Sequence, residues 1–166
     1  MLVRAAAAFF FLAASIAGAW AEDTLGCEKF KWSIARERTW FAASPKSVAA
    51  GAELTSTESA YLVALVAGDA SGFAVAPDRA PKPGAFGGVL KGVIVKPGLY
   101  QITLSDEAWI DVVQNGASVK SKDFSGKKDC PGVRKSVRFD LVAGPATLQI
   151  SNADVAKMMV AIAPAE

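Results

Sequence analysis

From residue 87 to residue 163, short apolar segments alternate with turn residues, and this rhythm constrains the fold more than any other feature. In "LYQITLS", the apolar side chains of Tyr100, Ile102 and Leu104 occupy every second position. Such alternation places apolar side chains on one face of a strand and polar side chains on the other. Turn signals recur about every 8 to 12 residues, a spacing typical of sandwiches and barrels. The sequence therefore predicts an all-β fold, an antiparallel, jelly-roll-like β-sandwich of about eight strands.

Three further patterns refine this prediction. In "RKSVRFDLVAG" we expect one set of side chains inward and the alternate set outward: Val137, Phe139 and Leu141 inward, Ser136, Arg138 and Asp140 outward. Asn115-Gly116 follows "AWIDVVQ" and predicts a hairpin, because a type I′ turn needs two residues that tolerate positive φ. Gly87-Gly88 interrupts a strand pattern and predicts a backbone bend or bulge.

The segment before residue 87 is less regular. Residues 60–67, "AYLVALVA", form a charge-free run typical of a strand covered on both faces. "FAVA" at 73–76 predicts a return strand, and the three prolines of residues 77–84 predict an irregular loop. Residues 46–58 are polar and small, and they carry no strand signal.

Residues 27–45 combine an extended pattern with a helical one. Phe30, Trp32 and Ile34 alternate as in an extended chain. "SIARERTWFAAS" then predicts a short helix with Ser33 as N-cap, ended before Pro45. We expect the aromatic side chains here to pack over one end of the core.

The first 21 residues predict a signal peptide, with a basic Arg4, an apolar stretch and small residues at Ala19 and Ala21. Cleavage there leaves residues 22–166 as a single β-sandwich domain of ordinary size. A membrane anchor is the alternative, although the uncharged stretch has the minimum length for a span. The mature chain is therefore expected in the periplasm or outside the cell, without stable membrane insertion.

Two cysteines, Cys27 and Cys130, are the only ones in the chain. An even pair in an exported protein predicts a disulfide, because that compartment is oxidising. A reactive thiol pair is the alternative, but the C-x-x-C spacing is missing. Leu25-Gly26 before Cys27 also fits part of a lipidation motif, although Glu22-Asp23 interrupts the apolar segment that such a motif continues.

The chain contains no histidine, and its net charge is +2. The missing imidazole excludes Ser-His and Cys-His nucleophile pairs and removes the usual transition-metal ligand. The balanced charge does not favour nucleic acid as a partner. We therefore expect a protein that is not an enzyme and that needs no cofactor or metal.

The stretch "TLSDEAWIDVVQNG" holds the best candidate ligand site. On a strand, Trp109 and Asp111 share one face, and Asp106 and Glu107 lie at the turn before it. An aromatic ring beside carboxylates is typical of sugar-binding sites, and oxygen-rich turns also suit Ca²⁺, the one cofactor alternative. The competing interpretation is structural, with Trp109 packed at the sandwich edge and Asp111 facing water or a lysine.

A basic segment follows the hairpin. Its candidate ligand-binding side chains are Lys120, Lys122 and Arg138, within a run that also includes other lysines and arginines. Such a patch attracts anionic polysaccharides or acidic proteins. The alternative is a solvated loop and an outward strand face. A single concave surface that combines these cations with Trp109 is one arrangement the sequence allows.

"GLYQITLSDEAWIDVVQNG" and "SGKKDCPGVRKSVRFDLVAGPATLQIS" resemble a group of small exported bacterial proteins of unknown function, over most of the mature chain. Members are sometimes labelled homogentisate dioxygenase, an enzyme that holds iron through histidines, which this chain lacks. The strand rhythm is also similar to pre-peptidase C-terminal domains and other jelly-roll binding modules.

These patterns together favour a non-catalytic exported binding module for a glycan or another cell-envelope component. The first alternative is a structural subunit that docks on an envelope protein. The second is a carboxylate-based hydrolase that uses Asp106, Glu107 and Asp111.

Overall fold

The structure is a computed structural model that describes residues 26–166. The predicted signal peptide lies outside the described residues. Within them, eleven strands form two sheets, with one α-helix, α1 (Ala35–Ala42), and two 3-10 turns, η1 (Cys27–Lys29) and η2 (Gly68–Ala70). The six-stranded sheet has the order β1 (Lys46–Ala49), β2 (Ser59–Ala64), β11 (Lys157–Pro164), β5 (Gly98–Leu104), β9 (Lys135–Leu141) and β8 (Ser121–Gly126). The five-stranded sheet has the order β3 (Val66–Ala67), β4 (Phe86–Ile94), β10 (Gly144–Ala153), β6 (Trp109–Gln114) and β7 (Ala117–Val119).

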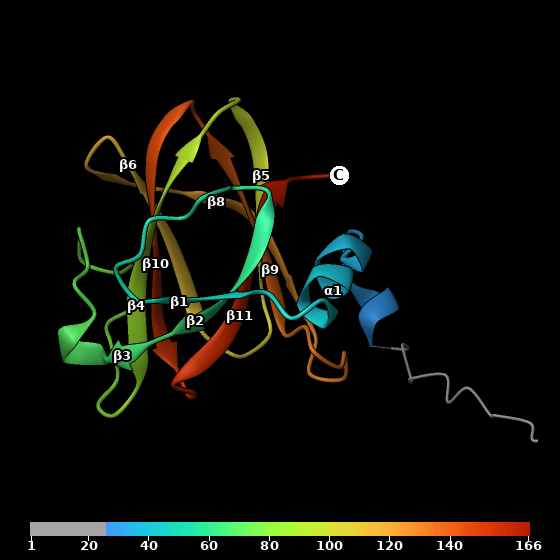
Figure 1. The fold of residues 1–166 in the computed structure, drawn as a ribbon, viewed down its shortest axis with the longest axis horizontal. Helices are drawn as coiled ribbons and strands as arrows, with labels where there is room; N and C mark the ends of the chain where they lie inside the picture. The colour runs from blue at the N-terminus through green and yellow to red at the C-terminus, as the bar shows by residue number, and fades with distance from the viewer. Residues whose placement is uncertain (1–25) are drawn as a thin grey trace, which may run out of the picture.

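Eight of these strands reproduce the jelly-roll order, β2-β11-β5-β9 in one sheet and β4-β10-β6-β7 in the other. Successive strands mostly lie in opposite sheets, so the chain passes repeatedly across the sandwich (Figure 1). The predicted all-β, jelly-roll-like sandwich is therefore confirmed. The three additional strands, β1, β3 and β8, lie at sheet edges, and β1 pairs with β2 in parallel.

The main core lies between the sheets and is built by the inward set of each strand. The inward orientation of Val137, Phe139 and Leu141 is confirmed, since all three belong to this core. Asn115 and Gly116 have φ values of 52° and 75°, as the predicted hairpin requires. The register of β10 against β4 shifts opposite Gly87. The bulge therefore lies on β10, the strand that pairs with β4, and not at the predicted Gly87-Gly88.

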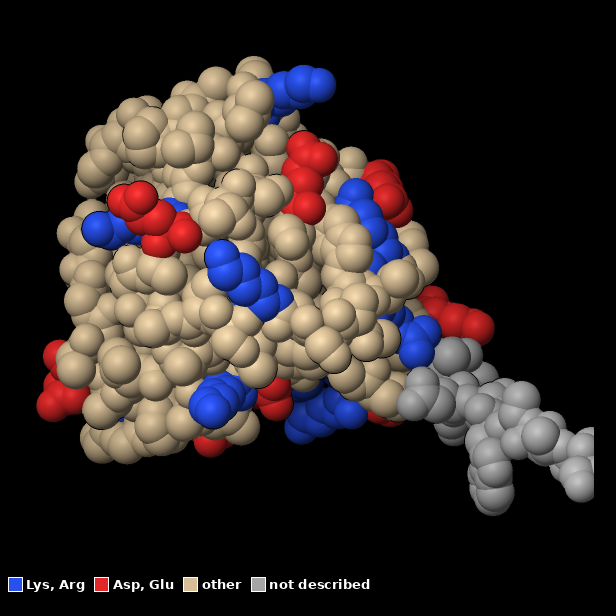
Figure 2. All heavy atoms as spheres, in the orientation of Figure 1, with Lys and Arg blue, Asp and Glu red and all other residues tan. Residues whose placement is uncertain are grey.

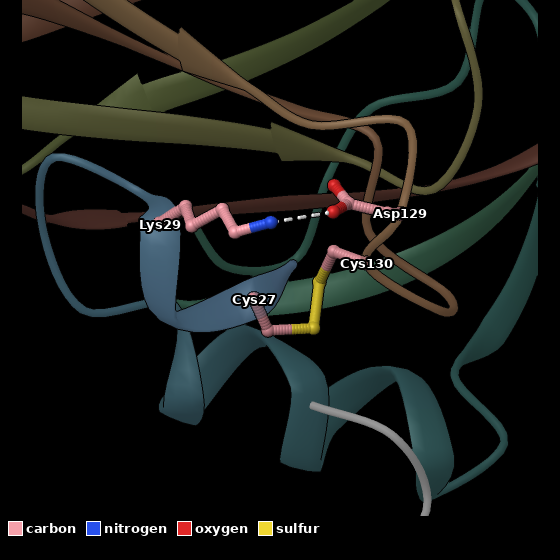
Figure 3. Close-up of a disulfide and its surroundings, with 4 residues drawn as sticks. All are labelled: Cys27, Lys29, Asp129 and Cys130. Atoms are coloured by element: carbon pink, nitrogen blue, oxygen red, sulfur yellow. Dashed lines mark hydrogen bonds and ion pairs between the residues drawn. A yellow bond between two sulfur atoms is a disulfide. The ribbon is translucent and has the colours of Figure 1, made fainter. Parts of the chain in front are cut away.

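The outer face of the six-stranded sheet is covered by residues 26–45, the N-terminal cover (Figure 1). A second apolar cluster lies beneath it and includes Phe30, Ile34 and Phe41. The predicted disulfide is confirmed: Cys27 bonds to Cys130, beside a surface ion pair of Lys29 and Asp129 (Figure 3). Because its sulfur is in this bond, Cys27 is not free to carry a lipid.

The outer face of the five-stranded sheet is covered by residues 71–83, the loop cover. Gln149 projects from β10, accepts hydrogen bonds from the main-chain amides of Ala74 and Val75, and donates to the Val75 carbonyl. Asn152 binds the main chain of the same cover at Ala80 and Lys82. The predicted return strand at 73–76 is therefore wrong, because side-chain amides take the place of a strand ladder.

Other local predictions also change in the structure. The run at 60–67 is divided between β2 and β3, which lie in different sheets. Residues 30–32 form bends and residues 33–34 have no regular structure, so the predicted extended strand is absent. The helix begins at Ala35 with Ile34 as its N-cap, and the Ser33 hydroxyl accepts a hydrogen bond from the Ala35 amide. Ser136 faces outward as predicted, yet it is buried because the N-terminal cover lies over it.

Candidate functional site

Trp109 and Asp111 lie on the outward face of β6, as strand alternation predicts, while Ile110 and Val112 enter the core. The Trp109 indole Nε1 donates a hydrogen bond of 3.0 Å to Asp111 Oδ1. Asp111 is only 4% exposed, because the loop cover and β10 enclose this face. The expectation that Asp111 faces water or a lysine is therefore wrong.

The second oxygen of Asp111 has an unusual environment. Among the described residues, Asp111 Oδ2 is buried without a hydrogen-bond partner. Burial raises the pKa of this carboxyl above its ordinary value of 3.8, the nearby Asp78 carboxylate adds to the rise, and the bond from Trp109 opposes it. The main-chain amide of Asp78 also acts to lower the pKa of Asp111. It does so without forming a hydrogen bond to Oδ2.

A cleft of about 320 Å³ opens beside Trp109, between the edges of the two sheets. Its lining comes from β6, β8, β9 and the loop cover: Arg79, Trp109, Ile110, Ser121, Phe124, Lys135 and Val137. The cleft forms because β7 pairs only with residues 112–114 of β6. The chain then crosses to the other sheet at Lys120, which leaves the Trp109–Asp111 edge of β6 open toward β8.

Two cations lie over the Trp109 ring within this cleft. The Arg79 guanidinium is 4.4 Å and the Lys135 Nζ 4.9 Å from the ring centroid, both within cation–π range. Lys135 Nζ also donates to the Ala108 carbonyl at 3.1 Å. Burial lowers the pKa of the Lys135 ammonium, and the Glu107 carboxylate partly opposes this. The cleft therefore combines positive charge with aromatic and aliphatic surface.

The two acidic turn residues bind neighbouring side chains. Asp106 Oδ2 accepts from the Ser105 hydroxyl at 2.5 Å, and Glu107 forms an ion pair with Arg134. Since Asp111 is also bonded within the protein, the carboxylates near Trp109 are engaged instead of being directed into the cleft. Within the described residues, no group of three or more acidic, cysteine or histidine side chains has the geometry to hold a metal ion.

The basic candidates do not join this cleft. Lys122 pairs with Asp140 at 3.2 Å on the surface, and Lys120 is exposed at the crossover between β7 and β8. Arg138 lies on the outer face of the six-stranded sheet, 4.2 Å from the Trp32 ring centroid. Trp109 faces out from the opposite sheet, so these cations and Trp109 do not share one concave surface.

Of the seven residues that line the cleft, only Trp109 was among the candidate site residues, although Lys135 lies within the predicted basic run. Lys135 has the same strand parity as the inward Val137, and that parity was the signal that could have identified it. Phe124 is an aromatic residue in an otherwise polar strand and is 62% exposed. Arg79 lies in a proline-rich loop, where no periodicity indicates its position.

The chain matches no known protein-family model, no curated protein and no solved structure. Across residues 26–166, the structure contains no helix with the length and apolar character needed to span a bilayer. The disulfide between Cys27 and Cys130 is typical of proteins outside the reducing cytosol.

Proposed function

We propose that this protein is a non-catalytic binding module of the periplasm or cell exterior, and that its cleft takes an acidic saccharide of the cell envelope. One observation carries the proposal: two cations and two aromatic rings line the same cleft of about 320 Å³. The predicted signal peptide supports the location, and the disulfide fits it.

The charge of the expected ligand follows from the cleft lining. Among the described residues, neither Arg79 nor Lys135 forms a salt bridge, whereas Glu107 is paired with Arg134. A carboxylate or phosphate on the ligand would give these cations a partner of opposite sign. Ser121 adds a hydroxyl, and Phe124 adds an exposed ring for the apolar face of a sugar. This favours an acidic saccharide over a neutral one.

We expect the cleft to bind its ligand without cleaving it. The chain has no histidine to act as a general base. Asp106, Glu107 and Asp111 each bind a different protein group, so they do not form a pair across one open site.

Titration calorimetry of the exported protein with polyuronate and neutral oligosaccharides tests the proposal. We expect Arg79→Gln and Lys135→Met each to weaken binding of the acidic saccharide by roughly tenfold or more, because each removes a charged partner. Lys122→Gln is the matched control, since Lys122 lies outside the cleft and pairs with Asp140. Equal affinity for acidic and neutral saccharides, or an equal loss in the control, would contradict the proposal.

A second candidate function is docking on an envelope protein. The observation that favours it is β8, an exposed strand at the edge of the six-stranded sheet, beside the open edge of β6. Open edges accept an added strand from a partner chain. Recovery of the protein alone in a pull-down from envelope extract would count against this function.

A further inference from the structure

Exposed aliphatic side chains gather at one end of the sandwich. Across the described residues, five large hydrophobic side chains are exposed, and four of them lie in two neighbouring turns or in the strand ends beside them. We call these four the apolar tip: Val93 (59% exposed), Val95 (75%), Leu99 (36%) and Val142 (52%). The fifth, Phe124, belongs to the cleft lining.

The two turns lie side by side because of strand pairing. One joins β4 to β5 and the other joins β9 to β10. Val93 pairs with Pro145, and Leu99 pairs with Asp140, so each turn is flanked by the strands of the other. Both turns form the rounded upper end of the molecule in Figure 1. On the face that Figure 2 shows, this end carries almost no charge apart from a projecting basic side chain.

The main chain of the apolar tip is held by buried side chains. The Gln114 side chain accepts from the Val142 amide at 3.0 Å and donates to the Val142 carbonyl at 2.9 Å. The Tyr100 hydroxyl donates to the Lys96 carbonyl at 3.0 Å, and the Thr57 hydroxyl donates to the Val93 carbonyl at 3.2 Å. These peptide groups keep their hydrogen bonds when water is removed, which is the condition for contact with lipid.

We propose that the apolar tip inserts between the headgroups of a lipid bilayer and docks the protein peripherally. A rounded protrusion of aliphatic side chains suits a deformable lipid surface, whereas a protein partner would have to supply a matching groove. Lys96 lies within the β4–β5 turn and is exposed, so its ammonium can reach lipid phosphates while Val95 enters the interface. Glu58 lies near Tyr100 at this end, so insertion depends on apolar contact more than on net charge.

This docking would orient the cleft away from the membrane. Trp109 pairs with Ser151 near one end of β10, and Val93 pairs with Pro145 at the other end. The cleft and the apolar tip therefore lie at opposite ends of the sandwich. The inference does not rest on the proposed function, because the two sites share no residue.

Vesicle co-sedimentation of the exported protein tests the inference. The probes are vesicles of phosphatidylethanolamine with phosphatidylglycerol and vesicles of phosphatidylcholine alone. We expect the protein to bind both, with little dependence on salt. Val95→Asp combined with Val142→Asp should reduce partitioning by roughly tenfold or more, because both side chains leave the interface. Both positions are exposed, so the fold should be retained, and thermal unfolding checks this.

Phe124→Ser is the matched control, because it removes an exposed hydrophobic side chain at the cleft. It should bind vesicles like the unaltered protein while losing affinity for acidic saccharides, so failure of either proposal is recognised separately. In a Val142→Trp variant, lipids brominated on their acyl chains should quench the added fluorescence. Absence of the unaltered protein from the vesicle pellet, or unchanged binding of the double variant, would overturn the inference.

Discussion

The two sheets are covered on their outer faces by segments of different chemistry. The N-terminal cover packs apolar side chains such as Phe30 and Phe41 against the six-stranded sheet and is tied down by the Cys27–Cys130 bond. The loop cover is held chiefly by hydrogen bonds between its main chain and the side-chain amides of Gln149 and Asn152. The N-terminal cover is therefore held by apolar packing and a disulfide, whereas the loop cover is held by hydrogen bonds.

Because of this difference, we expect the N-terminal cover to contribute mainly to stability and the loop cover to contribute to the candidate site. Beneath the N-terminal cover, outward polar groups such as Ser136 are bonded to neighbours, including the Trp32 indole. Within residues 26–166, each covered face also holds a buried polar atom without a hydrogen-bond partner, Arg138 Nε beneath the N-terminal cover and Asp111 Oδ2 beneath the loop cover. The loop cover also contributes Arg79 to the cleft. Segments held by fewer apolar contacts open more readily, so the loop cover is the one suited to respond to a ligand.

The largest expected effect comes from breaking the N-terminal cover. Replacing both cysteines, Cys27→Ser with Cys130→Ser, should lower the free energy of unfolding by up to about 4 kcal/mol, because the bond closes a long loop in the unfolded chain. Urea denaturation measures the change. Lys29→Gln, which removes only the neighbouring surface ion pair, is the control and should leave stability nearly unchanged. Equal midpoints for all three proteins would show that this cover is not held by the disulfide.

An intermediate effect is expected from releasing the loop cover. Gln149→Ala removes three hydrogen bonds to Ala74 and Val75 and should cost about 2 to 3 kcal/mol. Amide hydrogen exchange at those two residues should accelerate, while exchange in the N-terminal cover stays slow. Thr147→Ala, on the same face of β10, is the control. Unchanged exchange at Ala74 and Val75 would mean that other contacts hold the loop cover.

The smallest effect is a pH dependence at Asp111. Its folded-state pKa is raised above 3.8, so the folded protein binds the proton more tightly than the unfolded chain does. Stability from this group is present at acidic pH and is lost as pH rises through the folded pKa. The Asp111→Asn variant does not lose this stability as pH rises. Its melting temperature, measured relative to that of the unaltered protein, should therefore increase from acidic to neutral pH.

Asp123→Asn gives the opposite comparison. The hydrogen bond from Lys31 lowers the pKa of Asp123, so its stabilising contribution is lost as pH falls. The melting temperature of Asp123→Asn, measured relative to that of the unaltered protein, should therefore decrease as pH rises. The change should be small because the Lys31–Asp123 pair is exposed to solvent. The same sign of pH dependence in both variants would show that Asp111 is not penalised by burial.

Strand alternation made much of the fold predictable, because side chains of a strand point to opposite faces whatever surrounds them. This is why the inward set of β9 and the shared face of Trp109 and Asp111 could be inferred. The split of residues 60–67 between two sheets could not be, since an uninterrupted apolar run carries no mark where the chain changes sheet. The strand expected at 73–76 failed because Gln149, distant in sequence, binds that main chain.

The sequence by itself determined the sandwich class, the cysteine pairing, the hairpin at Asn115-Gly116 and the absence of histidine chemistry. These depend on local periodicity, turn preference and composition, which need no knowledge of distant contacts. Only the tertiary structure decided that Arg79 and Lys135 lie over Trp109 and that Asp111 is enclosed. Those contacts join segments far apart in the chain, and their geometry is set by how the two sheets and their covers pack.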